Sequence, residues 1–215
     1  MRENMLWNSA GSITYLACQW LVTVLIVRLS NGYDAAGLLS LAMSVTGTFG
    51  TFANYKMGTY QISDIKHENT TSEYLGFRLI TLGGSFVACV IYSLITCPLS
   101  SLLTIVLYFL FKAVGLVIDI LHGLDQLNRR MDFIGKSFML QGFATLAAFV
   151  GIFWLMQNLD AAIIAMGVAT LAVLFLYDLP HSRTFESFGV GITSKKALYL
   201  LKRSFSAVLA SLACS

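Results

Sequence analysis

Six long, uninterrupted apolar segments dominate this sequence. They cover residues 9–27, 36–55, 74–97, 99–121, 137–156 and 161–179. Each is close to the roughly 20 residues that a helix needs to cross the hydrocarbon core of a bilayer. Backbone polar groups in lipid must be hydrogen-bonded within the protein, so only helices or a closed barrel can span it. The segments are continuous and do not alternate, which predicts an all-α, polytopic bundle of about six transmembrane helices.

Composition supports a membrane protein. Only 12% of the residues are charged and 57% are hydrophobic, whereas soluble domains carry about 25% charged residues. The first apolar segment has no small-residue cleavage site, so we expect a membrane helix and not a signal peptide. A last apolar piece, at residues 205–214, is too short to span. We therefore expect a six-helix lobe at residues 1–203 and the start of a truncated seventh helix at 204–215.

The basic residues gather on one side of the predicted bundle. Three predicted connections are short, at residues 29–35, 97–100 and 157–160, and three are long and polar, at 56–73, 122–136 and 180–203. Of the 14 Lys and Arg residues, 12 lie at the N-terminus or in or beside the long connections. Arg28 lies on the other side, and Lys112 lies within a predicted helix. The positive-inside rule predicts that the N-terminus and the long connections are cytoplasmic.

No catalytic motif is present. The sequence contains no P-loop, G-x-S-x-G or H-E-x-x-H motif, and its four cysteines form no C-x-x-C pair. His67, His122 and His181 fall in predicted connections, and we interpret them as solvated. These absences favour transport or scaffolding over an enzyme. We expect no catalytic residues, no metal, no cofactor and no nucleic-acid partner.

Ionisable residues within the apolar segments are the sharper signal. Lys112 and Asp119 are seven residues apart, so they share a helix face at a separation of roughly 10 Å. Charges are too costly to point at lipid, so this face should look into the bundle or a watery cavity. Lys112 could instead snorkel to the interface, and Asp119 could simply be solvated. Arg28 and Arg78 are either interfacial anchors or part of a cationic path for an anionic substrate.

Glycines give a packing prediction. Gly47 with Gly50, and Gly83 with Gly84, would let neighbouring helices approach closely, because a glycine has no side chain to separate the backbones. This is a signal for packing and not for function.

Several polar stretches resemble a known family. They are Asn-Ser-Ala-Gly-Ser at 8–12, the helix start at 36–44, Tyr-Gln-Ile-Ser-Asp at 60–64, Ser-Glu-Tyr-Leu-Gly-Phe-Arg at 72–78, Asp-Ile-Leu-His-Gly-Leu-Asp-Gln at 119–126 and the stretch at 130–137. Together they resemble bacterial polysaccharide biosynthesis proteins of the O-antigen and capsule flippase type. These belong to the multidrug/oligosaccharidyl-lipid/polysaccharide exporter superfamily. The resemblance extends over nearly the whole chain.

The resemblance implies export, in lipopolysaccharide or capsule synthesis, of a polyprenyl-diphosphate-linked oligosaccharide unit across the bacterial plasma (inner) membrane. Family members have two similar halves around a cationic cavity. The partners implied are membrane lipids, the lipid-linked oligosaccharide, and a glycan polymerase or second half-transporter. Arg28, Arg78 and Lys112 match as cavity cations. Asp64, Asp119, Asp125 and Gln126 match as motif positions without an assigned role.

The sequence departs from the family pattern in charge and in length. The family tends to have an acidic residue near Gly115 and an arginine at Gln141, and both charges are missing here. The chain also corresponds to the N-terminal half of such a transporter.

Three alternatives remain open at this point. One is a drug or cation exporter of the same superfamily, which would place more acidic residues in its cavity. The second is a non-transporting scaffold subunit for glycan assembly. The third is a membrane-embedded polymerase or acyltransferase, for which only Asp34 and Asp160 are predicted on the extracytoplasmic side.

Overall fold

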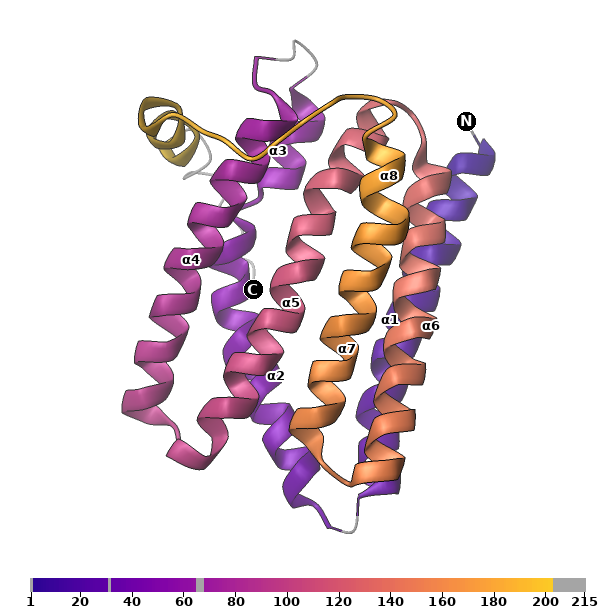
Figure 1. The fold of residues 1–215 in the computed structure, drawn as a ribbon, viewed down its shortest axis with the longest axis vertical. Helices are drawn as coiled ribbons and strands as arrows, with labels where there is room; N and C mark the ends of the chain where they lie inside the picture. Colours follow the sequence, from indigo (N-terminus) through magenta and orange to yellow (C-terminus); the bar gives the residue numbers. More distant parts are fainter. Residues whose placement is uncertain (1, 31, 65–67, 203–215) are drawn as a thin grey trace.

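The described part of the chain is a bundle of six membrane-spanning segments without strands (Figure 1). The computed structural model describes residues 2–30, 32–64 and 68–202. The elements are α1 (Arg2–Leu29), α2 (Asp34–Asn54), α3 (Met57–Ser63), α4 (Thr71–Thr96), α5 (Leu99–Leu127), α6 (Met131–Met156), α7 (Leu159–Val173), the π-helical turn η1 (Leu174–Asp178) and α8 (Leu179–Ser182). This confirms the predicted all-α transmembrane bundle. Residues 203–215, which include the predicted seventh helix, lie outside the described residues.

The surface of the bundle is that of a multi-pass membrane protein. In an apolar stretch of 18 residues from each spanning segment, only 22 to 39% of the residues are buried inside the structure. Large apolar side chains such as Ile95 and Leu176 are 77% and 80% exposed. A soluble protein does not expose contiguous apolar surface on this scale, so lipid must cover it.

The helices pack in a definite order around α5. α1 packs mainly against α6, α2 packs against α4 and α5, and α7 packs against both α5 and α6. The start of α1 lies at the same end of the bundle as α3 and α8, and the turns that join α1 to α2, α4 to α5 and α6 to α7 lie at the opposite end (Figure 1). The long, basic connections therefore share one end of the molecule.

Glycines do not act where the sequence predicted. A β-carbon built at Gly47, Gly50, Gly83 or Gly84 meets nothing within 4 Å. The close approach lies instead between α1 and α6, where a β-carbon on Gly11 would stand 2.2 Å from the carbonyl oxygen of Gly135. Glycine at both positions is what allows these two helices to touch along their backbones.

Two of the predicted long connections are wrong in extent. The predicted connection at 122–136 is a short turn, because α5 continues to Leu127 and α6 begins at Met131. Within the extended end of α5, His122 contacts Asp178 and Asp125 accepts a hydrogen bond from Ser182, so these polar residues have partners inside the bundle. The helix predicted to stop at Pro180 continues through it to Ser182. The π-helical turn just before Pro180 widens the helix and accommodates a residue that donates no backbone hydrogen bond.

The third connection contains a sharp bend and a short helix. Tyr55 and Lys56 both adopt the left-handed conformation, with φ of 46° and 51°, and they separate α2 from α3. Such a conformation is uncommon for residues with a side chain and costs free energy. It turns the chain so that α3 packs against α5.

Candidate functional site

A cavity of about 710 Å³ lies between α1, α2, α5 and α6. Its α2 wall is small and polar, and its α5 wall carries Lys112, Asp119 and His122. Gly47, Gly50 and Gly115 line it, and their lack of neighbours leaves the space open. Large ligand sites have volumes of this order.

Lys112 lies in the wall of this cavity, on the same helix as Asp119. Its ammonium group stands 5.5 Å from the ring centre of Tyr108 and 5.2 Å from that of Phe111. Among the described residues, no carboxylate lies within ion-pair distance of it. Lys112 is thus a cation held by aromatic faces and available to an anion.

Lys56 is a second cavity cation, and the sequence prediction missed it. The sequence predicts Lys56 in the polar connection at residues 56–73. The left-handed bend at Tyr55 and Lys56 places Lys56 in the wall of the cavity and of a smaller adjoining pocket of about 280 Å³. Only the bend brings this residue to the site, and a bend between non-glycine residues leaves no clear signal in the sequence.

Arg78 lies behind the cavity wall and has no exposed side-chain surface. Its Nη1 donates hydrogen bonds to the carbonyl oxygens of Ala53 (3.1 Å) and Asn54 (2.6 Å), and its Nη2 pairs with Asp119 (2.8 Å). Carbonyl groups at the end of a helix lack intrahelical donors. Arg78 supplies those donors for α2 and so fastens the bend before Lys56.

The hydrogen bonds of Arg78 to Ala53, Asn54 and Asp119 form a clamp. Asp119 connects this clamp to the cavity. Its side chain is 46% exposed, and it lines both pockets. A β-carbon on Gly58 would stand 2.9 Å from its Oδ2. A side chain at Gly58 would therefore displace the Asp119 carboxylate from its present position beside Arg78.

The motif stretches at residues 60–64 and 119–126 contact each other. The side-chain amide of Gln61 donates to the carbonyl oxygen of Ile120 at 3.1 Å, which fixes the side chain against α5. A β-carbon on Gly123 would stand 2.4 Å from Oε1 of Gln61. Gly123 is thus the residue that lets α3 lie flat on α5.

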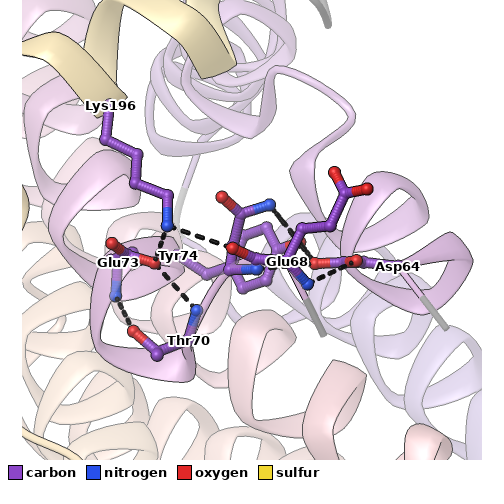
Figure 2. Close-up of polar contacts among 7 residues, drawn as sticks. Asp64, Glu68, Thr70, Glu73, Tyr74 and Lys196 are labelled. Carbon is purple, nitrogen blue, oxygen red and sulfur yellow. Dashed lines mark hydrogen bonds and ion pairs between the residues drawn. The ribbon is translucent and has the colours of Figure 1, made fainter. Parts of the chain in front are cut away.

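Asp64 organises the connection between α3 and α4, away from the cavity (Figure 2). It accepts hydrogen bonds from the backbone N–H groups of Glu68 and Asn69, each at 3.0 Å, and from the hydroxyl of Tyr74 at 2.7 Å. Burial opposes ionisation, but these hydrogen bonds outweigh it and lower the pKa of Asp64 below its ordinary value. These contacts indicate that Asp64 stabilises the fold of this connection.

The connection that follows α8 is tied to the same place. Lys196 forms an ion pair with Glu73 (2.9 Å) and donates to the carbonyl oxygen of Glu68 (3.0 Å), as Figure 2 shows. Thr70 caps α4 through a reciprocal pair of hydrogen bonds with Glu73. These contacts hold residues 194–202 against the start of α4.

The remaining predicted residues are spread out. Asp125 is buried and accepts a hydrogen bond from Ser182 at 3.2 Å, while Gln126 lines the smaller pocket. Arg28 is exposed at the opposite end of α1, outside the cavity wall. The expectation that His122 is solvated was wrong: it is 6% exposed and contacts Asp178. His67 lies outside the described residues.

The two positions that depart from the family pattern both line the cavity. Gly115 and Gln141 are part of its wall. Gln141 is buried, and its amide donates to the hydroxyl of Ser137 at 2.9 Å. The cavity therefore lacks one acidic and one basic side chain relative to that pattern. Among the described residues, no group of three or more His, Cys, Asp or Glu side chains could hold a metal ion.

Comparison with known proteins gives two matches. No family model matches the chain. The chain is 23% identical, over 99% of its length, to the capsular polysaccharide biosynthesis protein CapF of Staphylococcus aureus, of which it covers 54%. Its fold is similar to that of the Vibrio cholerae MATE transporter VcmN in its bent form, with a TM-score of 0.71 and 13% identity, covering 98% of this chain and 52% of that one.

The sequence match confirms the resemblance to a polysaccharide biosynthesis protein. The solved transporter supports the fold alone. The chain spans about half the length of each protein that it matches.

Proposed function

We propose that this chain forms one lobe of an exporter that moves a polyprenyl-diphosphate-linked oligosaccharide across the plasma membrane. The observation that carries this proposal is the cavity wall with Lys56 and Lys112, neither of which forms an ion pair with another described residue, and with Asp119, which is already paired with Arg78. A diphosphate is an anion, and cations in a site of low dielectric constant attract it strongly. The relative's name associates a similar chain with capsule polysaccharide.

A second lobe would complete the site. α1 packs only lightly against α2, and the cavity that lies between these helices has glycines with open space in its wall. Transporters of this kind bind substrate between two similar halves. That the chain covers about half of its relatives supports a partner lobe, in the same polypeptide or in another.

Binding to the full chain in lipid nanodiscs tests the proposal. The probe is a short-chain polyprenyl diphosphate linked to a sugar. Lys112→Gln and Lys56→Gln should each weaken binding by about 10- to 150-fold, because a hydrogen bond to a charged group contributes about 1.5–3 kcal/mol. Arg28→Gln is the matched control, since Arg28 lies outside the cavity wall, and it should bind like the original chain.

Two results would contradict the proposal. The first is equal loss of binding in Lys112→Gln and Arg28→Gln, which would show that the lysines act only through overall charge. The second is binding of a lipophilic cation in preference to the diphosphate. That result would favour a drug or cation exporter, for which Asp119 would be the binding group.

A further inference from the structure

A buried polar cluster joins α5 to η1 and α8. Nε2 of His122 lies 3.3 Å from Oδ1 of Asp178, and Oδ1 of Asp125 accepts a hydrogen bond from Ser182 at 3.2 Å. His122 is 6% exposed, and both aspartates are 1% exposed. Ionisable residues buried within membrane segments are costly, and they mark ion or proton pathways in many membrane proteins.

The charges in this cluster do not balance without protons. The cluster contains two buried carboxylates and one imidazole: Asp178 contacts the ring of His122, and Asp125 is joined to Ser182. If both were ionised beside a neutral ring, the cluster would carry two negative charges in an apolar setting, which is strongly unfavourable. Moreover, Oδ2 of Asp178 is buried and has no hydrogen-bond partner among residues 2–30, 32–64 and 68–202. An unpartnered carboxylate oxygen beside an imidazole is a position where a proton can reside.

Asp178 lies in an irregular part of its helix. Asp178 closes the π-helical turn η1, and turns of this kind occur frequently at functional sites. The hydroxyl of neighbouring Tyr177 is also buried, and no described residue forms a hydrogen bond with it. Two adjacent side chains with unpaired polar atoms show that this turn is not arranged for hydrogen bonding within the bundle alone.

The other charged groups nearby are engaged elsewhere. On α8, Nδ1 of His181 lies 2.7 Å from the carbonyl oxygen of Tyr177. At the start of α6, Arg130 pairs with Asp132 at 2.9 Å, and Lys136 lies 3.8 Å from the same carboxylate. On α5, Asp119 pairs with Arg78. Among the described residues, no Lys or Arg lies within 4.0 Å of Asp125 or Asp178.

We propose that His122, Asp178 and Asp125 form a proton-binding site that exchanges with the cavity through His122. His122 is one of the residues that line the cavity and the smaller adjoining pocket, which provides the route. One proton moves between cavity water and either the ring nitrogen or the free carboxylate oxygen, and no other bond changes. An anion in the cavity and a proton on this cluster then stabilise each other reciprocally. This last step rests on the proposed function.

Histidine NMR on the full chain in detergent tests the site directly. With ¹³C-labelled histidine, His122 is assigned by His122→Gln. In Asp178→Asn its signal should titrate at a lower pH, with about a tenfold loss of proton affinity, because a neighbouring negative charge favours the protonated ring. Asp132→Asn is the matched control, since that carboxylate contacts Arg130 and not His122, and it should leave the signal unchanged.

Identical His122 titrations in the original chain and in Asp178→Asn would overturn the proposal. So would an equal change in Asp132→Asn. If Asp178→Asn does not elute as a folded protein, Asp125→Asn provides the same test, because removing that carboxylate should also move the titration to lower pH.

Inorganic pyrophosphate serves as the anionic probe for the link to the cavity. It should move the His122 titration to higher pH, and Lys112→Gln should abolish this effect. If Asp178→Asn gives the expected change and pyrophosphate gives none, the proton site stands and its link to an anion in the cavity is overturned. Failure of the proposed function is thereby distinguished from failure of the proton site.

Discussion

At the scale of single residues, Arg78 shows how a buried charge can serve the backbone. Its guanidinium is enclosed by the end of α2 and by Asp119. From the sequence it could be read as an anchor or as a cavity cation, because both explain an arginine near the end of an apolar segment. The bend between α2 and α3, which creates the carbonyl groups that it caps, was not predicted.

Arg78→Met should lower the free energy of unfolding by about 3 kcal/mol. The substitution leaves carbonyl groups at the end of α2 without donors and Asp119 without its cation. Thermal unfolding in detergent measures the change. Arg28→Met is the control, because Arg28 is exposed. Equal stability of the two variants would show that the clamp contributes nothing.

At the scale of elements, the apolar segments were predictable and their polar ends were not. Hydropathy placed all six spans, since lipid demands length and continuity. It ended helices at His122 and Pro180, because it treats polar residues and proline as boundaries. In the structure both residues lie within helices: His122 is buried and contacts Asp178, and Pro180 is exposed and directly follows the π-helical turn.

The same limit applies to the site. Lys112 could be singled out because it interrupts an apolar segment, and it lies in the cavity wall. Lys56 could not, because its place depends on two left-handed residues. The contact of Gln61 with Gly123 joins segments about 60 residues apart, and no local pattern reports such a distance.

The connection between α3 and α4 should lose order in acid. The pKa of Asp64 in the folded protein lies below its unfolded value, because hydrogen bonds to the carboxylate outweigh the effect of burial. Its stabilisation is therefore fully present above the unfolded value of about 3.9 and is lost as the pH falls through the folded value.

Hydrogen exchange of residues 68–74 as a function of pH measures this loss. In Asp64→Asn the exchange protection should already be low at neutral pH and should not fall further in that acidic window. Asp34→Asn, at the opposite end of the bundle, is the control. Unchanged protection of these residues in Asp64→Asn would contradict a structural role for the carboxylate.

At the scale of the whole molecule, charge and topology agree. The long basic connections predicted from the sequence gather at one end of the bundle (Figure 1). Lys and Arg are retained in the cytoplasm during insertion. We therefore propose that this end, with α3, α8 and residues 194–202, is cytoplasmic.

Reporter fusions test this orientation. A fusion after Thr70 should report a cytoplasmic position, and a matched fusion after Asn158 should report the opposite side, because the two positions lie at opposite ends of the bundle. Extracytoplasmic activity after Thr70 would reverse the proposed orientation. The same signal from both sites would reject the six-span topology.

The backbone contact between Gly11 and Gly135 has a consequence for motion. α1 and α6 touch so closely there that neither can slide without a clash, whereas α1 meets α2 only lightly. The lobe thus has a tight contact between α1 and α6 and a loose contact between α1 and α2, and the cavity lies beside the loose contact. A change in the width of the cavity should come from α2 swinging about the bend at Tyr55 and Lys56, while α1 and α6 move as one body.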